Sequence, residues 1–176
     1  MLESLYQLVR DVPDFPKAGI LFRDITPLLL SPPAFRLAVH QLAEPFRSEG
    51  ITKVVAIESR GFVLGAPVAL ELGAGLVLVR KPSKLPAAKR RVEYDLEYGK
   101  DVLEVHADAL ARDDRVLIVD DVLATGGTAA ATAWLVEEAG SQLVAIEMLI
   151  ELADLRGRAR VGAQRRLHSV LTYPRP

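Results

Sequence analysis

The chain has 176 residues, and 22 Lys and Arg residues nearly balance 23 Asp and Glu residues, so the formal net charge is −1. A net charge this close to zero supplies no general attraction to nucleic acid or to an anionic membrane. The absence of cysteine excludes disulfides, thiolate nucleophiles and cysteine-ligated metals. The length suits one compact domain. We therefore expect a single domain over residues 1–176, without a nucleic-acid or membrane partner.

The first ten residues mix apolar and charged side chains, which predicts a short amphipathic helix rather than a secretion signal. Further along, the apolar run 66–79 is interrupted by proline, glutamate and glycine, so it is too broken for a membrane-spanning helix. From these two observations we expect a cytoplasmic protein.

Four apolar runs rich in β-branched residues predict strands. They are Lys53–Ile57, Leu76–Val79, Arg115–Val119 and Leu143–Ile150. Their apolar residues are mostly continuous rather than alternating, which is typical of strands covered on both faces.

Helical segments separate these strands. Residues Thr128–Ala139 are rich in helix formers and are followed by Gly140, a usual residue just past a helix end. An earlier helix is expected to end near Leu72 and Gly73, and Pro67 leaves its start open. Repeated strand, helix, strand units predict an α/β fold with a parallel-stranded central sheet flanked by helices. Ligands of such sheets bind at the carboxyl ends of the strands.

Two segments are strongly basic. Residues 80–91 carry six basic side chains and no acid, and acids and tyrosines follow up to Lys100. This long stretch without a clear core face predicts a functional loop or lid, the alternative being a solvated hairpin. Residues Arg156–Arg166 hold five arginines without interleaved aromatic residues, which indicates a solvated surface rather than a nucleic-acid site.

The most informative stretch is VLIVDDVLATGGT, residues Val116–Thr128. An apolar strand ends in Asp120 and Asp121, and a small-residue turn leads into a helix. Backbone N–H groups of such a turn, Thr hydroxyls and the helix N-terminus can together bind a phosphate. The two carboxylates would repel a phosphate, so they need a partner with hydroxyl donors or a bridging cation. A phosphorylated sugar has both the phosphate and the hydroxyls.

Other chemical motifs are missing from the sequence. It has no P-loop, no dinucleotide-binding glycine pattern and no serine-hydrolase elbow. His40, His106 and His168 are far apart and lack metal-ligand spacing, so we expect them to be structural.

The stretch 116–128 resembles the signature of the type I phosphoribosyltransferases, which bind 5-phosphoribosyl 1-diphosphate (PRPP). Four other segments are similar to the adenine-specific members of that family in particular. They are Phe15–Thr26, Glu58–Phe62, Arg80–Pro86 and Tyr94–Gly99. The resemblance spans nearly the whole chain and implies the family's α/β fold with a flexible catalytic loop. The implied reaction, a step of purine salvage, forms AMP and diphosphate from adenine and PRPP.

The resemblance also implies roles for individual residues. The turn would bind the 5′-phosphate, the two aspartates the ribose hydroxyls, and the remaining residues the diphosphate. The full PRPP-binding set is Ser59, Arg60, Arg80, Lys81, Lys84, Asp120, Asp121, Ala124, Thr125, Gly126, Gly127 and Thr128.

Catalytic roles fall on Glu97, Tyr98 and Arg60. Glu97 would transfer a proton with the imidazole ring of the base, and Tyr98 would pack over the reacting site when the loop closes. The adenine-binding positions are Leu21, Phe22, Arg23 and Leu152. Mg²⁺ is expected to arrive bound to PRPP, held by substrate and water oxygens, with no direct protein ligand.

In the family the basic loop reaches a neighbouring site, so we expect a homodimer. Three other functions stay open at this stage. One is a phosphoribosyltransferase for another purine, such as xanthine, hypoxanthine or guanine. Another is a PRPP-sensing regulatory protein that binds nucleic acid through residues 156–166. The last is a sugar-phosphate binding module without catalysis.

Overall fold

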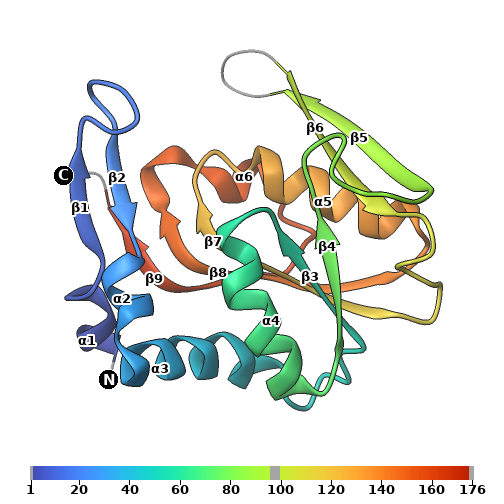
Figure 1. Ribbon diagram of the computed structural model, residues 1–176, viewed down its shortest axis with the longest axis horizontal. Helices are drawn as coiled ribbons and strands as arrows, with labels where there is room; N and C mark the ends of the chain where they lie inside the picture. Colours follow the sequence, from blue (N-terminus) through green and yellow to red (C-terminus); the bar gives the residue numbers. More distant parts are fainter. Residues whose placement is uncertain (1, 96–99, 175–176) are drawn as a thin grey trace.

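The computed structural model describes residues 2–95 and 100–174. Its elements surround a twisted central sheet (Figure 1). In chain order they are α1 Leu2–Tyr6, β1 Arg10–Pro13, β2 Leu21–Asp24, α2 Thr26–Leu30, α3 Pro32–Ala43, η1 Glu44–Phe46, β3 Lys53–Ile57, α4 Arg60–Leu72, β4 Gly75–Val79, β5 Lys89–Asp95, β6 Lys100–His106, β7 Arg115–Leu123, α5 Gly127–Glu138, β8 Gln142–Leu152, η2 Ala153–Leu155, α6 Gly157–Val161 and β9 Leu167–Tyr173.

The central sheet has five strands in the order β4-β3-β7-β8-β9, and every neighbouring pair is parallel. The predicted fold class, a parallel sheet flanked by helices, is confirmed. The four predicted strands are present, with β7 continuing past its predicted end to Leu123. The sequence analysis did not identify β9, because its residues are mostly half-buried or exposed and carry no continuous apolar run.

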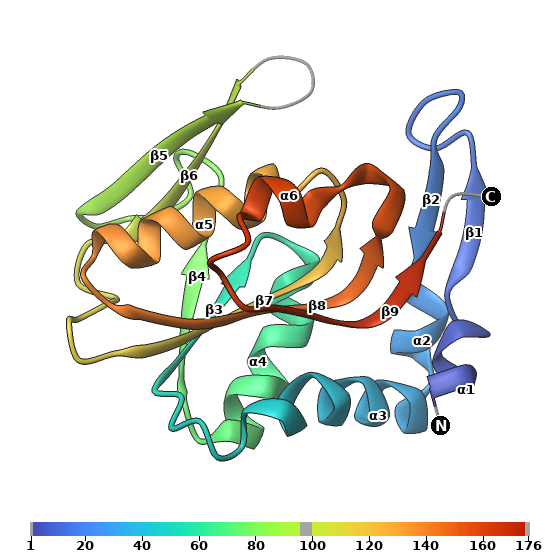
Figure 2. The same ribbon diagram turned by 180° about the vertical axis from the view of Figure 1, so that it is seen from behind.

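Helices cover both faces of this sheet. One core lies between the sheet and α3 and α4, and the other lies between the sheet and α5 (Figure 2). The apolar side chains of β7 alternate between the two, with Leu117 and Val119 in the first core and Val116 and Ile118 in the second. This two-sided burial explains why the residues from Val116 to Val119 are all apolar. In the described residues, no helix is long and apolar enough to cross a membrane.

Helix α4 begins at Arg60 and contains Pro67 in its interior, which answers the question that the sequence left open. It ends at Leu72 and is capped by Gly73, where φ is +65°, a left-handed conformation that glycine adopts without steric cost. A side chain at Gly65 would lie 2.6 Å from the Ala56 Cβ on β3. Close packing of α4 on the sheet therefore depends on that glycine, and it holds the start of the helix at the carboxyl end of β3.

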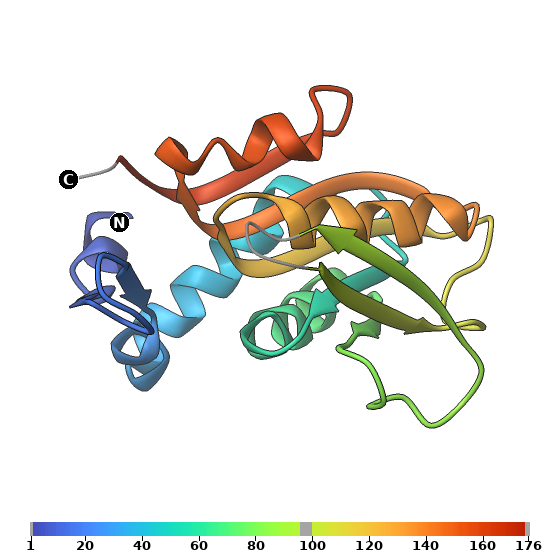
Figure 3. The ribbon, with the colours of Figure 1, turned by 90° about the horizontal axis from the view of Figure 1, so that it is seen from above.

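The segment 80–100, expected to be a loop or lid with a solvated hairpin as the alternative, contains strand β5 and the start of strand β6. Strands β5 and β6 pair antiparallel, with Tyr94 opposite Asp101. Val92 and Tyr94 alternate along β5 and pack against the core under α5, which gives this charged segment an apolar face. Figure 3 shows the hairpin beside α5. Two apolar side chains in a charged run were too weak a signal to predict a strand.

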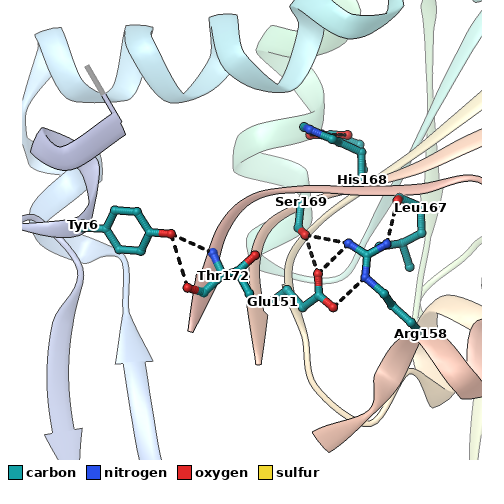
Figure 4. Close-up of polar contacts among 8 residues, drawn as sticks. Tyr6, Glu151, Arg158, Leu167, His168, Ser169 and Thr172 are labelled. Carbon is teal, nitrogen blue, oxygen red and sulfur yellow. Dashed lines mark hydrogen bonds and ion pairs between the residues drawn. The ribbon is translucent and has the colours of Figure 1, made fainter. Parts of the chain in front are cut away.

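A second hairpin, β1–β2, lies beside the carboxyl end of β9. The rings of Tyr6 and Tyr173 meet edge to face with centroids 5.2 Å apart. The Tyr6 hydroxyl donates to the Thr172 carbonyl at 3.3 Å and accepts from the Thr172 N–H at 3.0 Å (Figure 4). These contacts attach the N-terminal segment, with the predicted base-side residues on β2, to the end of the central sheet.

Candidate active site

Polar groups gather where β7 ends and α5 begins. Asp120 and Asp121 lie in the last part of β7 and are only 9% and 5% exposed. The turn after them leads directly into α5, which starts at Gly127. The turn and Asp120 line a pocket of about 70 Å³, several times the roughly 10–15 Å³ that one water needs. Its lining comprises Asp120, Val122, Leu123, Ala124, Thr125, Gly126, Gly127, Thr128, Ala129 and Met148.

Two glycines give this turn its shape. At Gly126 φ is +80°, and a Cβ there would lie 2.3 Å from the Gly157 carbonyl oxygen of α6. A Cβ at Gly157 would in turn lie 2.4 Å from the Ala124 carbonyl oxygen. The two backbones approach each other more closely than any side chain allows. The predicted small-residue turn thus packs closely on α6, a partner that the sequence did not indicate.

The two aspartates have different surroundings. Asp120 Oδ1 accepts the backbone N–H of Asp121 at 2.9 Å. Burial and the neighbouring charge of Asp121 raise the pKa of Asp120 well above its usual value. Asp121 accepts a hydrogen bond from Arg60 Nε. A Cβ at Gly61 would lie 2.7 Å from Asp120 Oδ1, so this glycine lets the start of α4 approach the acid pair.

Arg60 connects the predicted PRPP-binding residues with the predicted adenine-binding residues. Its guanidinium pairs with Asp121 and also lies 5.1 Å from the centre of the Phe22 ring on β2. Ser59 precedes it at the start of α4, after a cis peptide bond to Glu58. The structure therefore brings a predicted diphosphate residue, a ribose-side acid and a base-side ring into one cluster.

The basic run is neutralised by acids that the sequence analysis did not assign to it. Glu58 accepts from Arg80 Nε at 3.2 Å, from the Lys81 N–H at 3.0 Å and from Lys84 Nζ. Burial by itself would raise the pKa of Glu58, but these donors outweigh it and hold the pKa below its usual value. Lys81 Nζ pairs with Asp101. The partners lie about 20 residues or more away in the chain, so only the fold reveals them.

The predicted base-side residues lie on β2 and at the end of β8. Leu21, Phe22 and Arg23 belong to β2, and Leu152 ends β8. Arg23 pairs with Asp11 and stacks over the Tyr173 ring at 4.2 Å. Tyr173 is the register partner of Leu152. The sequence analysis did not identify this tyrosine, whose pKa is raised by burial to about 12.

Glu97 and Tyr98, the predicted catalytic loop residues, lie outside the described residues. Within those that are described, no group of three or more His, Asp and Glu side chains is placed to hold a metal ion.

Arginines of the second basic segment form ion pairs with acids on β8 and α5. Arg158 on α6 donates to both oxygens of Glu151 at 2.6 and 2.7 Å, and Ser169 completes the cluster (Figure 4). Arg165 pairs with Glu137 at 2.7 Å. His168, predicted to be structural, lies 2.9 Å from the buried carboxylate of Glu147.

Comparison with known proteins covers nearly the whole chain. Residues 29–166 match the family model of the phosphoribosyl transferase domain. The adenine phosphoribosyltransferase of Methylococcus capsulatus is 55% identical over 172 residues, covering 98% of this chain and all of that protein.

Solved structures agree with this match. The adenine phosphoribosyltransferase of Rhodothermus marinus superposes with a TM-score of 0.94 at 55% identity, covering 98% of both chains. The enzyme of Saccharomyces cerevisiae, solved with an imino-altritol bisphosphate and adenine, has a TM-score of 0.91 at 37% identity, covering 97% of this chain and 98% of that one.

Proposed function

The chain belongs to the adenine phosphoribosyltransferases, and from this premise we propose how its residues carry out the reaction. The enzyme transfers the 5-phosphoribosyl group of PRPP to adenine and forms AMP and diphosphate. The bond from the sugar C1′ to diphosphate breaks, its electron pair leaves with diphosphate, and a bond from C1′ to an imidazole nitrogen of adenine forms. That nitrogen loses its proton. Catalysis needs a neutralised leaving group, a stabilised sugar cation and a positioned base.

The observation that carries the proposal is the small pocket of the 124–128 turn beside two buried acids. The 5′-phosphate occupies the turn, where backbone N–H groups and the hydroxyls of Thr125 and Thr128 donate to it. Asp120 and Asp121 accept the ribose hydroxyls and stabilise the positive charge that develops on the sugar. A phosphate-binding turn beside two carboxylates is complementary to one end of a phosphorylated sugar and to few other ligands.

The diphosphate occupies the cluster of Ser59, Arg60 and the basic run Arg80, Lys81 and Lys84. In the structure these cations pair with Asp121, Glu58 and Asp101. A diphosphate carries more negative charge than a carboxylate, so it competes with the carboxylates for these cations. On binding, each cation exchanges its carboxylate partner for a diphosphate oxygen. The ion pairs therefore hold the cations near the site before they bind the leaving group.

Adenine binds between Phe22 and Leu152, with backbone groups near Arg23 reading its edge. The attachment of Arg60 to the Phe22 ring supports this placement, because it brings the base side next to the diphosphate side. By resemblance Glu97 accepts the proton of the base and Tyr98 covers the reacting site.

Mg²⁺ fits this site as an ion brought by PRPP. The carboxylates at the end of β7 are hard oxygen donors close to where the substrate oxygens would lie, whereas the described residues offer no three-ligand cage. The ion would neutralise charge on the diphosphate while Asp120 and Asp121 hold the hydroxyls around it.

The whole chain acts as one phosphoribosyltransferase domain in the cytoplasm and assembles as a homodimer. Exposed apolar side chains on α4 and the edge strand β4 support the dimer, since such surfaces mark protein contacts. They are Val63, Leu70, Leu76 and Leu78. Sedimentation velocity should give twice the chain mass, and a monomer at working concentration would contradict it.

The direct test offers PRPP and Mg²⁺ with adenine, hypoxanthine, guanine and xanthine separately, and measures both nucleotide and diphosphate. Strong selectivity for adenine is the expected result. Activity with another base alone would keep the PRPP site and reject the base site. PRPP binding without turnover would favour a sensor or a binding module.

Two arginines give a matched test of the diphosphate site. Arg60 and Arg47 both form ion pairs, and their side chains are 45% and 44% exposed. Arg47 lies on the α3–α4 side and pairs with Glu44 and Glu71. Arg60→Gln should lower kcat/KM for PRPP by roughly 100-fold, as expected for loss of a leaving-group donor. Arg47→Gln should leave it unchanged, and equal effects of both changes would reject the assignment.

A further inference from the structure

The β5–β6 hairpin contacts the phosphate turn through one hydroxyl group. Tyr94, half-buried on β5, places its OH 3.2 Å from the Oγ1 of Thr128 in the first turn of α5. The same OH lies 3.2 Å from Oδ2 of Asp101, its register partner on β6. Thr128 also lines the small pocket. Tyr94 thus connects its own hairpin to the proposed 5′-phosphate site at the start of α5.

The hydrogen-bond donors among Thr128, Tyr94 and Asp101 can be assigned from the charge of the carboxylate. Asp101 pairs with Lys81 through Oδ2 and accepts the Val102 N–H at 2.8 Å through Oδ1, so its carboxylate only accepts. Tyr94 must therefore donate its single proton to Asp101. The contact between the two hydroxyls then requires Thr128 to donate to Tyr94. Two hydroxyl protons serve two contacts, and both contacts are satisfied.

A phosphate oxygen at Thr128 changes this count. The phosphate also only accepts, so a third contact is added while the number of hydroxyl protons stays at two. One contact must be lost. Hydrogen bonds to charged acceptors are about twice as strong as those between neutral groups. Thr128 therefore donates to the phosphate, Tyr94 keeps donating to Asp101, and the contact between Thr128 and Tyr94 is the one that breaks.

We propose that Tyr94 is a positioning residue whose hydrogen bond with Thr128 fastens the β5–β6 hairpin to the phosphate turn, and that a bound 5′-phosphate releases it. This inference rests on the proposed function, because it takes the turn as the 5′-phosphate site. Its consequence is that phosphate binding frees the hairpin from α5 at this contact. Asp101 on β6 would move with the hairpin, and because it pairs with Lys81 of the proposed diphosphate site, the contact links the two ends of PRPP.

The test uses the full chain, the variant Tyr94→Phe and ribose 5-phosphate as the probe. Without the hydroxyl no contact is lost on binding, so Tyr94→Phe should bind the probe roughly three- to tenfold more tightly by titration calorimetry, the range of one neutral hydrogen bond. Tyr6→Phe is the matched control. Its hydroxyl also makes two hydrogen bonds, both to Thr172 and away from the turn. This control should bind the probe as wild type does.

Amide hydrogen exchange over residues 89–95 and 100–106 supplies a second measurement. Ribose 5-phosphate should speed exchange in the wild-type and Tyr6→Phe hairpins. Exchange in Tyr94→Phe should be fast already and unchanged by the probe. Should this variant fail to fold, the wild-type comparison still decides the question.

The other outcomes separate the two levels of inference. If ribose 5-phosphate binds all three proteins equally and leaves hairpin exchange unchanged, the role of Tyr94 is refuted while the phosphate site stands. If the wild type does not bind ribose 5-phosphate at all, the assignment of the turn fails, and the role of Tyr94 fails with it.

Discussion

Two pairs of buried acids lie on neighbouring strands of the same sheet, and their surroundings differ. Glu147 and Glu151 on β8 each face a side chain that contacts both carboxylate oxygens through nitrogen, His168 for the first and Arg158 for the second. Asp120 on β7 accepts one backbone N–H and lines a pocket. A buried acid whose acceptors are filled stabilises the fold, whereas one that faces open space can bind a ligand.

The pKa values of Glu151 and Asp120 follow the same division, whereas burial raises that of Glu147 to about 7. Burial by itself would raise the pKa of Glu151, but Arg158 and Ser169 hold it below its usual value. Burial and the charge of Asp121 leave the pKa of Asp120 well above normal. The aspartate pair thus stores unfavourable charge that a ligand with hydroxyl donors or a cation would relieve. This comparison predicts that changes at β7 affect activity and changes at β8 affect stability.

The largest effect is expected for Asp120→Asn. The amide keeps the shape but cannot stabilise positive charge on the sugar, so kcat/KM for AMP formation should fall by roughly 100- to 1000-fold. Because burial and Asp121 disfavour a charge at this position, the neutral amide should leave stability level or raise it. Steady-state kinetics and urea unfolding measure the two effects. A large loss of stability with activity retained would place Asp120 with the structural acids.

Arg158→Ala should show the opposite division. It leaves Glu151 buried without its cation, and we expect a loss of about 2–4 kcal/mol in unfolding free energy, reduced from the fully buried case because Arg158 is half-exposed. The kcat of the folded protein should stay near that of wild type. Urea unfolding and active-site titration test this prediction, and a loss of kcat without a loss of stability would contradict it.

The Glu147–His168 pair should make stability depend on pH. Burial raises the pKa of Glu147 to about 7, and the Glu147 contact raises that of His168 above 6.5. Both shifts mean that the folded state binds protons more tightly than the unfolded chain, so stability is highest at low pH within this range and falls as pH rises through neutrality. We expect a decrease on the order of 2 kcal/mol between pH 5 and pH 8.

Two variants check the source of this dependence. Glu147→Gln should flatten the pH profile of unfolding over the same interval. Glu151→Gln should lower stability equally at both ends, because the pKa of Glu151 is lowered and the group stays ionised throughout. If the unfolding free energy of Glu147→Gln still falls between pH 5 and pH 8, other groups cause the effect.

The smallest effect is expected for Ser169→Ala. The Ser169 hydroxyl donates to Glu151 at 2.5 Å and accepts from Arg158 at 3.0 Å. Its removal leaves both oxygens of Glu151 bonded to Arg158, so unfolding free energy should fall by only about 1 kcal/mol. Chemical denaturation of both variants in parallel should show a much larger loss of unfolding free energy for Arg158→Ala than for Ser169→Ala. The reverse order would refute the account of this cluster.

Local patterns predicted much of the fold. The strands of the sheet core and α5 follow from runs of apolar residues and helix formers that need no distant partner to be read. The hairpin β5–β6 and strand β9 could not be predicted in the same way. Their apolar residues are interrupted by polar ones, and the contacts of β5 with the core under α5 and of β9 with β8 appear only in the fold.

The sequence by itself determined the α/β class and the position of the turn proposed to bind the 5′-phosphate, because an apolar strand, two acids, small residues and a helix follow one another within about a dozen residues. Only the tertiary structure decided which polar side chains contact one another. Arg60 reaches Asp121 across 61 positions, Lys84 reaches Glu58 across 26, and Tyr94 reaches Thr128 across 34. Such pairs depend on strand order and register, which arise from the packing of the whole chain.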